Sequence, residues 1–181
     1  MEWSTSRMDR QTLVYKDPYQ QIYEVDAKIN GSERKYFVTD TGSRAGIVVV
    51  RNGAVLLVKQ HRLLVEGLSL EIPGGQVEQG ETPEVAAVRE CLEETGVHCL
   101  NLSPLVFYHL GLDMVYNPTH IFYSEEIVEA SEPDNVDTHE ISGTEWVPID
   151  TCINLIFKGQ ILDSFSVLAL LAYQAMLIRR S

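Results

Sequence analysis

A hairpin of two strongly apolar segments constrains this 181-residue chain more than any other feature of its sequence. Residues 45–50 (AGIVVV) and 54–58 (AVLLV) contain no polar side chain, and Asn52-Gly53 between them is a favoured two-residue turn. Strands with continuous apolar runs are buried on both faces, so other elements must cover each side of their sheet. The pattern predicts a layered α+β fold in which a sheet lies between helices.

Charge and composition exclude several classes of function. The 26 acidic residues outnumber the 14 Lys and Arg residues, and the net charge of −12 disfavours a broad nucleic-acid-binding face. A small anionic substrate remains compatible, because a divalent cation can supply positive charge locally. The three cysteines are too scattered for a disulfide scaffold. Because no secretory leader or membrane-length apolar segment is visible, we expect a cytoplasmic protein without membrane partners.

Further strands and helices are expected on both sides of the hairpin. Residues 20–29 and 35–39 are rich in aromatic and β-branched side chains, and Asn30-Gly31 between them signals another turn. The acidic stretch 125–140 predicts a surface loop. Shorter strands are expected at 69–72, 105–110, 120–123 and 144–148, and helices at 82–95, 149–157 and 164–179.

The helix expected over residues 82–95 carries three carboxylates on one face. At about 100° per residue, Glu93 and Glu94 lie about 60° and 40° to either side of Glu90. We expect this face to point away from the core. The residues expected to anchor the opposite face in the core are Val85, Val88 and Leu92.

A cluster of like charges on a helix has two explanations. It is either a solvated acidic face or, because Mg²⁺ prefers oxygen ligands, a cation site. Arg89 lies beside the acids and can orient one of them through a charge-assisted hydrogen bond. The preceding residues 73–75 (PGG) allow a close approach of the backbone. Both features favour the cation.

The stretch 75–97, GQVEQGETPEVAAVRECLEETGV, resembles the Nudix box G-x5-E-x7-R-E-U-x-E-E-x-G-U, in which U is apolar. Cys91 at an apolar position is its one soft departure, since buried Cys behaves as a small hydrophobe. The resemblance implies a Nudix hydrolase with an α/β/α sandwich and a mixed sheet. The fixed positions of the box are occupied by Gly75, Glu81, Arg89, Glu90, Cys91, Glu93, Glu94, Gly96 and Val97.

The resemblance also implies roles for these residues. In Nudix hydrolases, Mg²⁺ bound by box glutamates polarises the diphosphate of the substrate and activates the attacking water, and Mn²⁺ is an alternative metal. By position, Glu90 and Glu94 would be the main ligands, with Glu93 close by and the Gly74 carbonyl assisting. Glu81 and Arg89 would complete the catalytic group by holding the loop and the helix together.

Three segments outside the box, 59–62 (KQHR), 71–75 (EIPGG) and 143–173, resemble the ADP-ribose pyrophosphatase branch. Members of that branch begin with an N-terminal β subdomain that helps to form a homodimer. We therefore expect this subdomain in residues 1–42 and the hydrolase domain in 43–181. The branch also implies that Arg62 binds the substrate phosphates and that Glu78 helps to position metal or water.

The branch takes one more acid, a base or further metal ligand, from a loop well after the box. Glu140 matches this position best, and its rivals in the same loop are Glu132, Asp134 and Asp137. Residues 108–120 lack the Ser-Pro-Gly-like loop and the acid that the branch often carries there. This departure leaves open which nucleotide derivative is the substrate.

We expect a Mg²⁺-dependent pyrophosphatase that cleaves the diphosphate of a nucleoside diphosphate derivative. ADP-ribose or a related nucleotide sugar would give a nucleoside monophosphate and a sugar phosphate. The alternatives are a non-catalytic nucleotide sensor, a dinucleoside polyphosphate hydrolase and an isoprenoid diphosphate isomerase. The complete set of box glutamates argues against a sensor. An isomerase would need a cysteine at the substrate carbon, whereas Cys91 lies at an apolar helix position.

Overall fold

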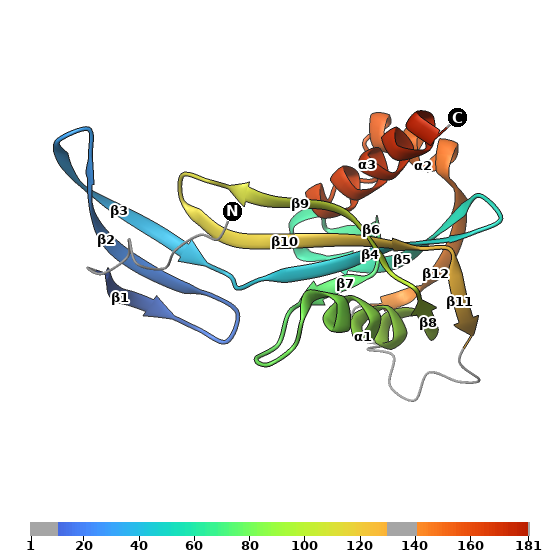
Figure 1. Ribbon diagram of the computed structural model, residues 1–181, viewed down its shortest axis with the longest axis horizontal. Coiled ribbons are helices and arrows are strands. Elements are labelled where there is room, and N and C mark those ends of the chain that lie inside the picture. The colour runs from blue at the N-terminus through green and yellow to red at the C-terminus, as the bar shows by residue number, and fades with distance from the viewer. Residues whose placement is uncertain (1–10, 130–140, 181) are drawn as a thin grey trace. The chain divides into compact units, whose positions relative to one another are not determined.

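The computed structural model describes residues 11–129 and 141–180, which divide into two compact units. The first unit contains residues 11–43 and 108–119, and the second contains the remaining described residues (Figure 1). Residues 108–119 thus belong to the first unit although they follow the helix of the box. The division of the chain into a dimerisation subdomain (1–42) and a hydrolase domain (43–181) stays a prediction.

The first unit is an antiparallel meander. Its strands are β1 (Gln11–Lys16), β2 (Gln21–Ile29) and β3 (Ser32–Asp40). Asn30 and Gly31 both have positive φ values, 50° and 84°, and join β2 to β3, so the Asn-Gly signal correctly predicted the turn. The beginning of β10 (Val115–Ser124) pairs with β3 in parallel. Among the described residues of this unit, the buried ones are Val25, Asn117 and Thr119.

The second unit is built on a sheet with the strand order β10-β4-β5-β12. The central hairpin consists of β4 (Arg44–Arg51) and β5 (Ala54–Arg62), and β12 (Ile141–Pro148) pairs with β5 in an antiparallel manner. Because β3 and β10 pair in parallel, the strand arrangement is mixed, as expected. The remaining strands are β6 (Gly67–Glu71), β7 (Gly74–Gln76), β8 (Val97–Leu100), β9 (Ser103–Gly111) and β11 (Glu126–Glu129).

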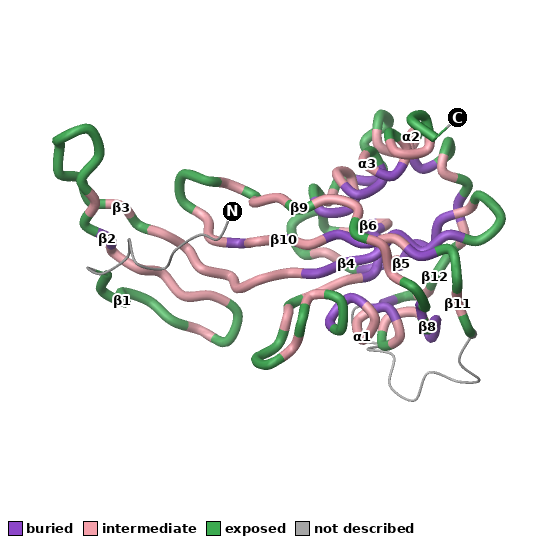
Figure 2. Tube along the Cα trace, in the orientation of Figure 1, coloured by how far each residue is buried: buried purple, intermediate pink, exposed green. Residues whose placement is uncertain are grey.

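Helices cover both faces of this sheet, as the apolar hairpin predicted. The helix α1 (Pro83–Thr95) lies on one face, and α2 (Ile149–Phe157) and α3 (Ser164–Arg180) lie on the other (Figure 1). Consecutive residues of a strand point to opposite faces, and Ile47, Val48 and Val49 of β4 are all fully buried. Figure 2 shows β4 coloured as buried along this stretch. The α/β/α sandwich is thereby confirmed. No helix in the described ranges is long and apolar enough to span a membrane.

The face of α1 that packs on the sheet differs from the predicted one. Ala86, Ala87 and Cys91 are fully buried, whereas Val85 is 54% exposed. The expectation that Val85 and its apolar neighbours Val88 and Leu92 anchor the helix was therefore wrong; the last two are only half-buried. The buried side chains join a core cluster with Ala45, Ile47, Val49, Leu56, Val97, Cys99 and Phe122.

This packing turns the acidic edge of α1 inward. From Glu90, Glu94 lies about 40°, Ala87 about 60° and Cys91 about 100° around the helix, all in the same direction. The buried stripe is therefore adjacent to the acids and not opposite to them. Cys91 Sγ lies 3.5 Å from Cys99 Sγ of β8, which shows how closely the helix approaches. Small side chains permit this approach, and Glu90 and Glu94 are half-buried as a result.

Three short strands, β7, β8 and β11, were not expected. The loop predicted over 125–140 is wrong at its start, because Glu126–Glu129 form β11 and pair with β8. β7 occupies part of the expected Pro-Gly-Gly turn and pairs with β4. These strands have four residues or fewer, so pairing with a partner defines them and local sequence does not. Residues 130–140 lie outside the described part.

Gly46 allows α3 to lie directly on β4. A Cβ at this position would overlap the ring of Phe165. We expect Gly46→Ala to lower the free energy of unfolding by about 1–3 kcal/mol, because the ring must leave its position in a packed core. Urea denaturation would measure this loss. Gly67→Ala is the control, since its Cβ would meet nothing closer than 3.6 Å. Equal stability of the two variants would contradict the packing described.

Candidate active site

The candidate active site lies where β7 meets α1, and the ends of α1 are fixed by local interactions. Thr82 is the N-cap, because its Oγ1 accepts a hydrogen bond from the Val85 N–H, and Pro83 is the first helical residue. Gly96 ends the helix with a φ of 71°. The boundaries predicted from the sequence are confirmed. They place the three acids on the last turns of the helix.

Glu94 is held against the backbone of β7. The Gly74 N–H donates a hydrogen bond of 3.0 Å to Glu94 Oε2. Burial raises the pKa of Glu94 to about 8, the Gly74 hydrogen bond opposes this shift, and the nearby Glu90 and Glu71 carboxylates add to it. The position is therefore costly for a negative charge unless a cation lies beside it.

Glu90 lies directly over Gly75. A Cβ at Gly75 would be 2.6 Å from Glu90 Oε2, so any larger residue would displace the carboxylate. Burial raises the pKa of Glu90, and the charge and hydrogen bond of Arg89 lower it. The first glycine of the box is therefore required because Glu90 occupies the space of its missing side chain. It does not have a positive φ.

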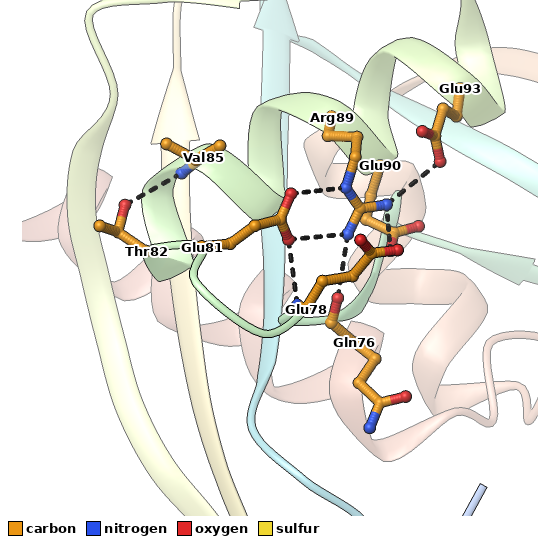
Figure 3. A network of polar contacts seen from close by, with 8 residues as sticks. All are labelled: Gln76, Glu78, Glu81, Thr82, Val85, Arg89, Glu90 and Glu93. Carbon is orange, nitrogen blue, oxygen red and sulfur yellow. Dashed lines mark hydrogen bonds and ion pairs between the residues drawn. The ribbon is translucent and has the colours of Figure 1, made fainter. Parts of the chain in front are cut away.

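Arg89 connects the acids with the loop before the helix (Figure 3). Its Nε and Nη2 donate to the two oxygens of Glu81 at 2.8 and 3.0 Å. Its Nη1 donates to Glu90 Oε1 at 2.9 Å and to Glu93 Oε2 at 3.2 Å. Nη2 also reaches the Gln76 carbonyl at 3.1 Å. The hydrogen bond from Arg89 lowers the pKa of Glu81, so this carboxylate is held in its charged form.

Glu78 contributes to the site through its backbone. Its N–H donates to Glu81 Oε2 at 3.0 Å, and its carbonyl accepts from the Glu81 N–H at 3.1 Å. These two bonds close the loop between β7 and α1. The Glu78 side chain is exposed. The structure thus explains Glu81 as the residue that ties loop and helix together, while a role for the Glu78 carboxylate in positioning metal or water stays a prediction.

Arg62 is paired with an acid that the sequence reasoning missed. At the end of β5, its Nε and Nη2 donate to Glu71 Oε1 and Oε2 at 2.9 and 2.6 Å. Glu71 is buried at the end of β6. The signal was present, because Glu71 is the single charge within the strand pattern 68–72 (LSLEI), which is otherwise uncharged and mostly apolar. The charges of Glu71 and Arg62 both act on the pKa of Glu94, so this pair lies within electrostatic range of that acid.

The carboxylates fit a hard cation, although they are not arranged as a ready metal cluster. Within the described residues, no group of three or more His, Cys, Asp or Glu side chains is placed to hold a metal ion. Arg89 instead holds Glu90 and Glu93. Glu90 and Glu94 nevertheless offer oxygen donors, which Mg²⁺ prefers, and burial raises the pKa of both. The two side chains and the Gly74 carbonyl stay predicted ligands.

The loop acid could not be placed. Glu140, which was the best match, lies outside the described residues. The same holds for its rivals Glu132, Asp134 and Asp137. The choice among these four carboxylates therefore stays a prediction.

Comparison with known proteins shows the family of this chain. The NUDIX domain family matches residues 40–164. An ADP-ribose pyrophosphatase of Bacillus subtilis is 28% identical over 151 residues, which are 82% of each chain. A CMP-5'-(N-acetyl-N-hydroxy-3-aminopropyl)phosphonate hydrolase of Streptomyces rubellomurinus is 28% identical over 88% of this chain and 78% of its own. A crystal structure of an ADP compounds hydrolase superposes with a TM-score of 0.77 at 19% identity, covering 96% of this chain and 94% of its own.

The family match covers well over half of the chain, and the box lies inside it. The chain therefore belongs to the Nudix family and is a Nudix hydrolase. The structural neighbour independently supports the fold. The predicted fold class and family are both confirmed.

The Arg89 network is expected to stabilise the folded protein. A lysine cannot reproduce the five hydrogen bonds of the guanidinium. We expect Arg89→Lys to lower the free energy of unfolding by about 2 kcal/mol, because Glu81 and Glu90 then lose charge-assisted partners. Urea denaturation would measure this, with Arg179→Lys at the exposed end of α3 as the matched control. If both variants unfold at the wild-type midpoint, the network has no structural role.

Proposed function

We propose that this Nudix hydrolase cleaves the diphosphate linkage of a nucleotide sugar in a Mg²⁺-dependent reaction. ADP-ribose is the first candidate substrate, and the products are a nucleoside monophosphate and a sugar phosphate. Mn²⁺ is an alternative metal. The observation that carries the proposal is the pair of half-buried acids, Glu90 and Glu94, held against the Gly74-Gly75 backbone. Their setting suits a cation, and a cation attracts a diphosphate.

Each side chain near these acids has a part in the proposed reaction. Bound Mg²⁺ supplies Lewis-acid polarisation of the phosphates and lowers the pKa of a water molecule. Glu90 and Glu94 hold the metal with help from Glu93 and the Gly74 carbonyl. Arg89 orients Glu90 and is itself fixed by Glu81.

Two further groups complete the proposed mechanism. Arg62 binds the substrate phosphates, and Glu71 fixes the plane of its guanidinium through two hydrogen bonds. The Glu140 carboxylate accepts the proton of the attacking water, and Glu78 assists in placing that water. A rigid arginine positions a diphosphate at a lower entropic cost than a mobile one does.

The relatives support a nucleotide substrate. The names of the Bacillus subtilis and Streptomyces rubellomurinus proteins describe hydrolysis of ADP-ribose and of a CMP phosphonate. In each case the substrate joins a nucleotide to another group through phosphorus. The matches to these two relatives cover 88% and 82% of this chain. We therefore place its substrate in the class of nucleoside diphosphate derivatives.

We propose that the enzyme is cytoplasmic and forms a homodimer, and the exposed surface of the first unit supports the homodimer. All six residues of β1 are exposed, and Leu13, Tyr15 and Phe37 are large apolar side chains that remain accessible. Exposed apolar surface of this kind favours association. A second copy of the chain is the proposed partner. Nucleic acid is not proposed as a partner, because the net charge is −12.

Glu94→Gln should abolish most of the activity while the fold persists. Loss of one metal-binding oxygen is expected to lower kcat/KM at least about a hundredfold. Coupled phosphatase assays would test ADP-ribose, ADP-glucose, GDP-mannose, UDP-glucose, NADH and diadenosine polyphosphates, with Mg²⁺ and with EDTA. Glu84→Gln in the first turn of the same helix is the control.

Unchanged turnover by Glu94→Gln would refute the metal role. A preference for diadenosine polyphosphates would reassign the enzyme to the dinucleoside polyphosphate hydrolases. Metal-dependent nucleotide binding without any product would instead identify a sensor.

Gly75→Ala provides a test of geometry that leaves every carboxylate in place. The new methyl group would displace the flexible end of Glu90, so stability should change by less than about 1 kcal/mol. Mg²⁺ affinity and kcat/KM should each fall at least about tenfold, because the acid can no longer occupy its position. Calorimetry with Mg²⁺ and the coupled assay would measure the two quantities. A wild-type Mg²⁺ affinity together with a wild-type kcat/KM would show that the position of Glu90 over Gly75 is not required.

A further inference from the structure

The short connection from β6 to β7, residues 72–73, is held by helices on both sides of the sheet. On the side of α1, the Gly74 N–H that follows the connection donates to Glu94 Oε2 at 3.0 Å. On the side of α3, the Ile72 N–H donates to Ser166 Oγ, also at 3.0 Å. The backbone that contacts the acid proposed to bind metal is therefore also fixed to a helix that carries none of the box residues.

Ser166 is a fully buried polar residue in the first turn of α3. Its Oγ–H and its N–H both donate to Asp163 Oδ2, each at 2.9 Å. Asp163 directly precedes the helix and thus acts as its N-cap. Because the hydroxyl proton is directed to Asp163, the serine oxygen is left as an acceptor for the Ile72 N–H. The two side chains form a chain of hydrogen bonds from the start of α3 to the connection.

Phe165, the neighbour of Ser166, supports the same backbone by packing. A Cβ at Gly74 would be 2.9 Å from Phe165 Cζ, and a Cβ at Gly46 would be 2.2 Å from it. Gly46 and Gly74 are opposite each other where β4 pairs with β7, so the ring lies against both strands at this point. The first turn of α3 therefore reaches residues 72–74 through a hydrogen bond and through close contact.

We propose that Ser166 and Asp163 are positioning residues of the active site. They hold Ile72, and with it the Gly74 backbone, where the Gly74 N–H meets Glu94. The inference rests on the proposed function, in which Glu94 and the Gly74 carbonyl bind the metal. Ligands of such a site must be held within about 0.5 Å of the productive geometry. A displacement at Ile72 is passed to Gly74, because only one residue separates them.

The alternative is that Ser166 only satisfies a buried backbone N–H and so stabilises the fold. The two explanations differ in what the loss of the hydroxyl changes. A structural role predicts a lower stability alone, whereas a positioning role predicts weaker metal binding beyond that caused by an equally destabilising change in the same helix.

Mn²⁺ binding measured by electron paramagnetic resonance tests the inference on the full chain, without substrate or turnover. The relevant site is the one that Glu94→Gln removes. We expect Ser166→Ala to weaken Mn²⁺ binding there about tenfold, because the Ile72 N–H loses its acceptor and the connection shifts. Ala169→Gly is the matched control, since Ala169 is also fully buried in α3 and its methyl group makes no hydrogen bond. This change should lower the urea midpoint of unfolding and leave the Mn²⁺ affinity unchanged.

Asp163→Ala and Asp163→Asn form a second pair, which decides the question even if Ser166→Ala does not fold. Both variants remove the same charge, so a difference between them reports the hydrogen bonds. Asparagine keeps an acceptor oxygen for Ser166 and is a good N-cap, so Asp163→Asn should bind Mn²⁺ more tightly than Asp163→Ala does.

The outcomes separate this inference from the proposed function. Unchanged Mn²⁺ affinity in Ser166→Ala, or equal affinities in the two Asp163 variants, would overturn the positioning role while hydrolysis of nucleotide sugars by the wild type upholds the function. An equal loss in Ala169→Gly would show a general effect of destabilising α3 and would also overturn it. If the affinities follow the expected order but the wild type hydrolyses no nucleotide sugar, the positioning role stands and the function is wrong. Mn²⁺ binding that survives in Glu94→Gln would place the metal elsewhere and refute both.

Discussion

The close approach of α1 to the sheet determines the rest of the candidate site. Ala86, Ala87 and Cys91 are small enough for the helix to lie on β4 and β7, and this contact carries Glu90 and Glu94 to the Gly74-Gly75 backbone. Larger side chains on this stripe would move the helix outward and return the acids to solvent. The site thus depends on a packing distance, and the glycines and alanines are required because they occupy little volume.

This packing concentrates negative charge in a partly buried place, and the surrounding residues compensate for it. Arg89 satisfies Glu81, Glu90 and Glu93, whereas Glu94 receives only a backbone N–H among the hydrogen bonds described for it. Burial therefore raises the pKa of Glu94. Among the residues described, Glu94 has no positively charged hydrogen-bond partner, and the Arg62 guanidinium acts on it from nearby. A cation can bind at Glu94 and a phosphate at Arg62 in such a setting. The fold supplies this electrostatic setting without a broad basic surface.

The sequence predicted the elements whose signals are local. The Asn-Gly turns, the buried hairpin and both ends of α1 follow from backbone preferences and periodicity, and each was found. The box also identified which residues belong together. The sequence did not predict β7, β8 or β11, because each is defined by a partner strand far along the chain. It also left Glu71 without a role, since pairing with Arg62 requires β5 and β6 to lie side by side.

The amino-acid sequence by itself determined the family, the layered fold and the presence of three acids on one helix. Only the tertiary structure decided which way that helix faces. Hydrophobicity favoured Val85, Val88 and Leu92 as the core face, but the sheet accepts the narrower stripe of Ala86, Ala87 and Cys91. The physical reason is that a helix buries the face whose shape fits its partner, and the shape of that partner is formed by residues distant in sequence.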